Sequence, residues 1–153
     1  MLTHCDFVYA AEKTKFQMPF IDLALVPEFG SSFSIPARIG HIRAAELILL
    51  GRPFDAKQAA DLGLVTQVVS EQNLLTTAIE TAQRLAAKST AAFQACKRLM
   101  KQSWREQLES AITAENQEFS SQVRSADARE ALKAFLEKRP PNFAPAMTPA
   151  NAA

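Results

Sequence analysis

One carboxylate in the first third of the chain stands in a setting that suits proton transfer. Glu28 lies in a loop that Pro27 and Gly30 bracket, and its neighbours Val26 and Phe29 are apolar. A carboxylate among apolar side chains loses part of its hydration and becomes a stronger base. The alternative is structural, since a glutamate just ahead of a helix can favour the helix dipole without touching any ligand. Glu28 is the first candidate for acid–base chemistry.

Other reactive side chains form no convincing constellation. Ser31 and His41 could suggest a hydrolase triad, but the sequence contains no G-x-S-x-G nucleophile elbow. His4 and His41 belong to no ligand cluster, so we expect no metal site. Cys5 and Cys96 are far apart and outside any CxxC motif. We therefore expect two buried, reduced thiols.

Composition narrows the class of protein. The chain has 153 residues, 48% of them hydrophobic and 22% charged, with a net charge of +1. This balance gives no electrostatic footprint for nucleic acid or an anionic membrane. The longest apolar runs fall far short of the roughly 20 residues that a membrane span needs. Neither end shows a targeting signal, so we expect a cytoplasmic protein.

The loop that carries Glu28 lies between short strands and short helices in the first 69 residues. Runs of β-forming residues predict strands over 5–10, 15–18 and 64–69. Ser31 or Ser32 is expected to cap a helix over 33–39, closed by Gly40. Glycines and a capping box predict two more helices, one over 41–50 and one that begins after Asp55 and stops at Gly63.

The remainder of the chain is expected to be helical. Apolar residues at helical spacing follow Ser70 and Ser89, a long helix covers about 104–122, and a last helix follows Ser125. Three short strands are fewer than the usual about 4–6 of a sheet. Sheet partners are therefore expected on residues outside this chain or on another chain. We divide the chain into an α/β part (1–69), a helical oligomerisation region (70–139) and a tail expected to be disordered (140–153).

An ordered series of motifs carries a resemblance to a known family. The series consists of HCDFVYA (4–10), KFQMPF (15–20), LVPE (25–28), IPARIG (35–40), AAELILLG (44–51), FDAKQA (54–59), LGLV (62–65) and AFLEKR (134–139). Over residues 4–143 it is similar to the second half of crotonase-family enzymes, the enoyl-CoA hydratases and isomerases. The resemblance implies a partial crotonase (ClpP/crotonase-like) spiral followed by a helical C-terminal region. It also implies that both amides of the family's oxyanion hole come from outside these residues.

The same resemblance assigns a reaction to Glu28. Family hydratases use two glutamates, of which one would precede Cys5 and the other falls at Phe20, whose ring cannot move a proton. Family isomerases resemble this chain at Pro27-Glu28 and use one carboxylate there. Glu28 would then be a lone proton shuttle that converts 3-enoyl-CoA to 2-trans-enoyl-CoA, in fatty-acid or related acyl-CoA degradation.

Substrate and assembly are implied in the same way. Phe20 and Phe29 would line the acyl site, while Phe135 and Lys138 match positions that resemble acyl-CoA contacts, the lysine on phosphate. From the residues alone, Phe135 could equally be core and Lys138 a solvated charge. Coenzyme A would be part of the substrate, with no other cofactor, and the whole protein would form a homotrimer or a dimer of trimers. Two alternatives stay open: a hydratase or other crotonase-type enzyme, and a non-catalytic fragment or interaction module.

Overall fold

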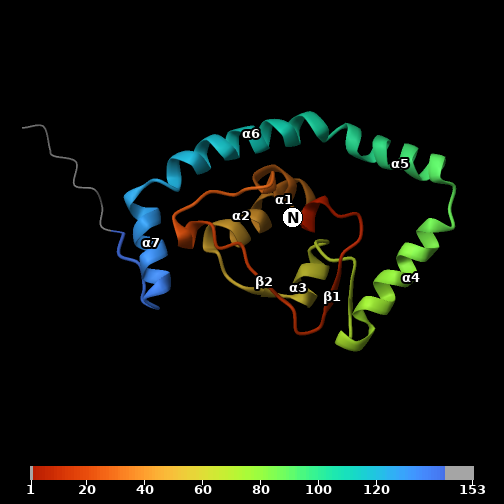
Figure 1. The fold of residues 1–153 in the computed structure, drawn as a ribbon, viewed down its shortest axis with the longest axis horizontal. Coiled ribbons are helices and arrows are strands. Elements are labelled where there is room, and N and C mark those ends of the chain that lie inside the picture. The colour runs from red at the N-terminus through yellow and green to blue at the C-terminus, as the bar shows by residue number, and fades with distance from the viewer. Residues whose placement is uncertain (1, 144–153) are drawn as a thin grey trace, which may run out of the picture.

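The described part of the protein is mostly helical, with four short strands near its centre. The computed structural model describes residues 2–143. The strands are β1 (Tyr9–Ala11), β2 (Lys15–Phe16), β3 (Phe54–Asp55) and β4 (Gln67–Val69). The helices are α1 (Ser31–Ile39), α2 (His41–Leu50), α3 (Ala56–Asp61), α4 (Leu74–Ala86), α5 (Thr90–Gln102), α6 (Arg105–Gln122) and α7 (Ala126–Leu136), with 3₁₀ turns η1 (Leu2–His4), η2 (Ile21–Leu23) and η3 (Glu71–Asn73). Helices α4 to α7 form an arch around a centre made of α1–α3 and the strands (Figure 1).

The strands form two small sheets. Strand β1 pairs in parallel with β4, Tyr9 opposite Gln67, and β2 pairs antiparallel with β3, Phe16 opposite Phe54. The main core lies between these sheets and helices α2 and α3, and a second cluster lies between α1 and α2. The buried apolar residues are Ala10, Leu47, Phe54, Ala56, Ala59 and Val65 in the first cluster, and Ile35, Ala44 and Ile48 in the second.

Several helix ends follow the local signals of the sequence. Helix α2 has the predicted bounds and ends at Gly51, which is left-handed with φ 60°. Asp55 caps α3, since its Oδ1 accepts the N–H of Gln58 at 2.8 Å. Ser89 and Ser125 cap α5 and α7 in the same way. These four expectations are confirmed.

The start of α1 differs from expectation. The helix begins at Ser31, two residues earlier than predicted. Its N-cap residue is Gly30, which has no side chain to accept hydrogen bonds from the free amides of the first turn. Neither Ser31 nor Ser32 is the cap, so that prediction is wrong. The acceptor for these amides comes from α6, as described below.

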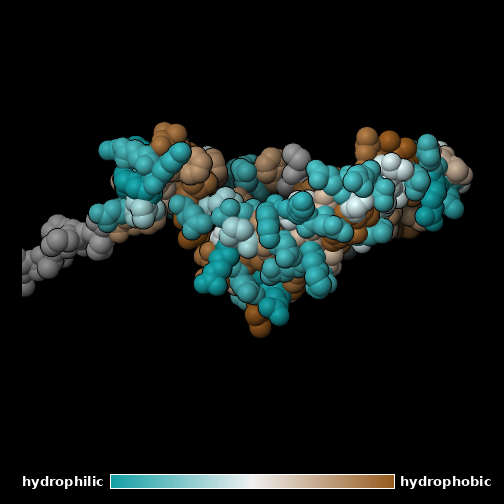
Figure 2. All heavy atoms as spheres, turned by 90° about the horizontal axis from the view of Figure 1, so that it is seen from below, coloured by the Kyte–Doolittle hydropathy of each residue, from teal (hydrophilic) through white to brown (hydrophobic). Residues whose placement is uncertain are grey.

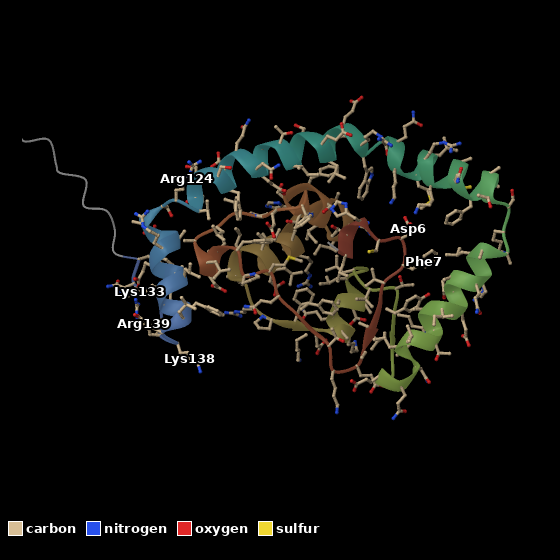
Figure 3. The ribbon with its side chains drawn as sticks, viewed as in Figure 1. Asp6, Phe7, Arg124, Lys133, Lys138 and Arg139 are labelled. Atoms are coloured by element: carbon tan, nitrogen blue, oxygen red, sulfur yellow. The ribbon has the colours of Figure 1, made fainter. Side chains whose placement is uncertain are left out.

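The strand predictions were too long. Of residues 5–10 only the last two belong to β1, and of 64–69 only 67–69 form β4, while the two-residue β3 was not predicted. The segment before β1 leans towards α5, where Asp6 pairs with Lys97 and Lys101 (Figure 3). The bond from Lys97 is the main reason that the pKa of Asp6 is lowered. The two ion pairs hold Asp6 against α5, and residues 5–7 join neither of the two sheets.

The cysteine prediction was also wrong. Cys5 and Cys96 are both exposed. Cys5 precedes β1 outside either sheet, and Cys96 lies on α5, a helix with no buried residue. Both thiols therefore lack the covering residues that burial would need.

The arch of helices leaves much apolar surface open. Figure 2 shows hydrophobic surface at both ends of the elongated molecule. The exposed large apolar side chains include Leu75, Ile79, Leu99, Met100, Leu132, Phe135 and Leu136. Among the residues that the structure describes, no helix is long and apolar enough to cross a membrane. Residues 140–143 of the predicted disordered tail are described, and the rest of that tail lies outside the described residues.

Candidate active site

A largely apolar pocket of about 300 Å³ lies beside the loop that carries Glu28. A pocket of this volume is at the lower end of the range for small-molecule sites. Its apolar lining includes Phe16, Met18, Phe20, Phe29, Ile35 and Phe54, and its charged lining residues are Glu28 and Arg38. An apolar chain with one reactive end fits such a lining.

Arg38 is held in place on one side of this pocket. One guanidinium nitrogen donates to the carbonyl of Thr3. The guanidinium carbon lies 5.9 Å from the ring centroid of Trp104, which itself meets Phe33 edge-on at 5.7 Å. These contacts fix the cation on the rim between α1 and α6.

Glu28 lies in a tight turn whose backbone is fixed at several points. Phe29 and Gly30 are both left-handed, with φ of 57° and 68°. The carbonyl of Glu28 accepts from Ser31 twice, from Oγ at 2.6 Å and from the backbone N–H at 3.1 Å. The carbonyl of Phe29 lies 2.6 Å from His4 Nε2, which must be the donor because a carbonyl can only accept. A left-handed non-glycine residue, as Phe29 is here, is the kind of strain that clusters at functional sites.

The Glu28 side chain itself is left free. Glu28 is exposed, and its carboxylate forms no hydrogen bond or ion pair with another described residue. The expected desolvation among Phe20, Val26 and Phe29 is therefore wrong for this chain, because the open rim of the pocket leaves the carboxylate in water. Phe20 and Phe29 do line the same pocket, whereas Val26 does not.

A second glutamate binds the turn from behind. Glu115 of α6 is only 5% exposed, and its two oxygens accept the amides of Gly30 at 2.6 Å and Ser32 at 2.8 Å. It therefore supplies the acceptors that the first turn of α1 lacks. Sequence reasoning missed this contact. The available signal was a charged residue on the apolar face of the helix, in line with Leu108 and Ile112.

Phe135 and Lys138 are not brought to the pocket. Phe135 lies on α7 and is 69% exposed, so its interpretation as a core residue is wrong. Lys138 is exposed just beyond the end of α7, at the end of the arch (Figure 3). Helix α7 packs on η2, which directly follows Phe20. Helix α7 is thus next to the pocket region, but neither Phe135 nor Lys138 lines the pocket.

An ion pair fixes the chain beyond α7. Arg139 binds Glu130 through two nitrogens, at 2.6 and 3.1 Å, and the N–H of Asn142 donates to Glu130 at 2.9 Å. The bonds from Arg139, followed by that from Asn142, lower the pKa of Glu130 to about 2. The same pair raises the pKa of Arg139. Residues 139–142 are thus tied back onto α7 beside Lys138.

Comparison with known proteins agrees with the architecture. A family model described as Enoyl-CoA hydratase/isomerase matches residues 1–146. The chain is 36% identical over 139 residues to a protein of Mycobacterium bovis named probable enoyl-CoA hydratase, covering 91% of this chain and 54% of that protein. It is also 36% identical over 138 residues to the 1,2-epoxyphenylacetyl-CoA isomerase of Escherichia coli, covering 90% of this chain and 53% of the isomerase.

A solved structure extends the similarity to the fold. The crystal structure of an enoyl-CoA hydratase/isomerase from Pseudoalteromonas atlantica matches with a TM-score of 0.90 and 36% identity, over 94% of this chain and 58% of that one. The backbones of the two chains thus follow closely similar paths over the matched part. The chain spans about half the length of the curated relatives it matches.

Proposed function

The chain belongs to the enoyl-CoA hydratase/isomerase family, and from that premise we propose that it carries the proton-transferring part of an enoyl-CoA isomerase site. The proposed reaction moves the double bond of a 3-enoyl-CoA into conjugation with the thioester, giving 2-trans-enoyl-CoA. Glu28 is the proposed catalytic residue. Coenzyme A enters as part of the substrate, and the reaction requires no redox or metal chemistry.

The proposal is supported mainly by the lining of the pocket, which combines one carboxylate with mostly apolar side chains. Glu28 is the only acidic residue among the lining residues drawn from the described part of the chain. Phe20, where family hydratases have their second glutamate by resemblance, presents a phenyl ring to the same pocket. One carboxylate can serve a reaction that takes and returns the same proton, whereas adding water across a double bond calls on two groups.

The proposed chemistry balances around a single proton. The Glu28 carboxylate removes a proton from C2 of the 3-enoyl thioester, and the electron pair moves into the thioester carbonyl as a dienolate. Glu28, now protonated, returns the proton at C4, and the C2–C3 double bond forms. Two backbone amides from outside these residues would hold the enolate oxygen, as the resemblance implies.

Hydration is the second candidate, because one relative is named a probable enoyl-CoA hydratase. That reaction would need an acid that the pocket lining does not supply. Assembly is a further proposal. The open apolar faces of α4, α5 and α7 support burial against other chains, as a trimer or hexamer would provide.

A direct assay tests the proposal. The chain, and the chain extended by any coding sequence that precedes it, are supplied with 3-hexenoyl-CoA for isomerisation and with 2-hexenoyl-CoA for hydration. We expect isomerisation, and a loss of about 10²–10⁴-fold in Glu28→Gln, as for removal of a general base. Glu80→Gln, an exposed change on α4, is the matched control. Hydration without isomerisation, or full isomerisation by Glu28→Gln, would reject the isomerase assignment.

A further inference from the structure

We propose that Glu115 is a positioning residue for Glu28, holding the turn behind it so that its carboxylate stays free to face the substrate. The proposal rests on the proposed function of Glu28. The contact behind it joins Glu115 to the amide of Gly30, 85 positions earlier in the chain. Glu115 does not line the pocket, so its effect must pass through the backbone.

The geometry leaves the turn little freedom. Both oxygens of Glu115 are occupied by the amides of Gly30 and Ser32, at 2.6 and 2.8 Å. Helix α6 also closes on the turn sterically, with Leu108 and Ile112 directly against Gly30. The backbone two residues after Glu28 is therefore held by contacts with helix α6. A shift of about 1 Å in a reacting group can cost about 10²-fold in rate, so such fixing has catalytic consequences.

Glu115 also takes the role that Glu28 could otherwise fill. The first amides of a helix attract a carboxylate through hydrogen bonds and the helix dipole. Glu28 is the acidic residue nearest to the start of α1 in sequence, and its exposed carboxylate bonds to no described residue. Because Glu115 already accepts hydrogen bonds from these amides, they offer the Glu28 carboxylate no free donor at the start of α1. Removing Glu115 would leave two amides unpaired and offer Glu28 a competing place away from the substrate.

The test combines amide exchange with turnover in a double-mutant cycle. Glu115→Gln keeps the side-chain volume but offers one acceptor oxygen for two donors, and Glu115→Ala offers none. We expect hydrogen exchange of the Gly30 and Ser32 amides to speed up at least tenfold in Glu115→Ala and less in Glu115→Gln. Amides of α7 serve as the internal reference. Glu118→Gln, an exposed change on the same helix, should leave exchange unchanged.

Turnover of 3-hexenoyl-CoA provides the functional readout. We expect kcat of Glu115→Gln to fall about 10–100-fold with KM within threefold. In a Glu28→Gln background the same change should alter the residual rate less than twofold, because nothing remains to be positioned. A merely structural role would instead lower the rate equally in both backgrounds, and that result would overturn the proposal.

The outcomes separate this inference from the proposed function. Loss of activity in Glu28→Gln with full activity in Glu115→Gln overturns the positioning role and leaves the isomerase assignment standing. Unchanged exchange at Gly30 and Ser32 in Glu115→Ala also overturns it. No turnover by the chain or by its extended form overturns both proposals together. Full turnover in Glu28→Gln does the same.

Discussion

Gly30 lies so close to Leu108 that a β carbon added to the glycine would be 2.3 Å from the leucine Cδ1. The same glycine is left-handed, with φ 68°, and its amide donates to Glu115. Gly30, two places after Glu28, is therefore constrained by its backbone conformation, by the close approach of Leu108 and by its hydrogen bond to Glu115. Helix α6 can approach the turn only because this position has no side chain.

The first prediction concerns that contact. Gly30→Ala combines a left-handed alanine with overpacking against α6, so we expect it to lower the free energy of unfolding by about 2–5 kcal/mol. Gly63→Ala is the control: Gly63 has a similar φ of 75° with nothing within 4 Å of the added carbon. It should cost only about 1–2 kcal/mol. Urea unfolding measures both, and equal losses would show that Leu108 moves aside freely.

The parts of the fold that sequence predicted are those set by local signals. Gly51 ends α2 through its own left-handed backbone, and Asp55 caps α3 through an amide three residues away, so their residue types alone were sufficient. The strands were less predictable. Phe54 and Asp55 form β3 only because Phe16 and Lys15 lie opposite them, and two residues give no periodicity to detect.

The site divides in the same way. Glu28 and Phe20 were found from motif and resemblance, and both line one pocket. Glu115 lies on the apolar face of its helix, in line with Leu108 and Ile112, but its partner Gly30 lies 85 residues earlier, and only the folded chain brings them together. The solvent exposure of Glu28 was equally invisible, because it depends on what covers the pocket rather than on the neighbours of Glu28 in sequence.

The second prediction follows from the exposed thiols. Both Cys5 and Cys96 should react with a water-soluble disulfide reagent in the folded chain, without denaturant, because neither is covered. We expect two equivalents of released thiolate, falling to one in Cys5→Ser and in Cys96→Ser. Reaction that requires urea would mean that other surfaces, such as those of a second copy, cover these positions.

The third prediction concerns acid stability. The pKa of Glu130 is lowered to about 2, mainly by Arg139. A carboxyl whose pKa is depressed on folding stabilises the protein fully above its ordinary pKa of 4.5, and this contribution is lost as pH falls through about 2. We expect carbon-detected NMR titration to show the pKa of Glu130 returning towards 4.5 in Arg139→Met.

The control for this titration is Arg98→Met, an exposed change on α5. It should leave the titration of Glu130 unchanged. Wild type and Arg139→Met should also differ in stability at neutral pH and converge near pH 2, the value about which Glu130 loses its charge. A difference in stability that persists undiminished in acid would show that Arg139 acts through packing instead of charge.

The last prediction tests whether Lys138 contacts coenzyme A. Of the cations at this end of α7, Arg139 is paired with Glu130, and Lys133 lies 4.0 Å from Glu137. Lys138 forms no ion pair with a described residue and is exposed. An unpaired ammonium group can form an ion pair with a phosphate of the nucleotide.

Lys138→Gln should therefore raise KM for 3-hexenoyl-CoA about tenfold without changing kcat, since the lost contact would be the same in ground and transition states. The effect should shrink as salt is added, because an exposed charge is screened. Lys133→Gln, a nearby exposed lysine on α7, is the matched control. The decisive comparison uses 3-hexenoyl-pantetheine, which lacks the nucleotide phosphates. An equal rise in KM with that thioester would show that Lys138 acts on something other than phosphate, and no rise with either substrate would leave Lys138 a solvated charge.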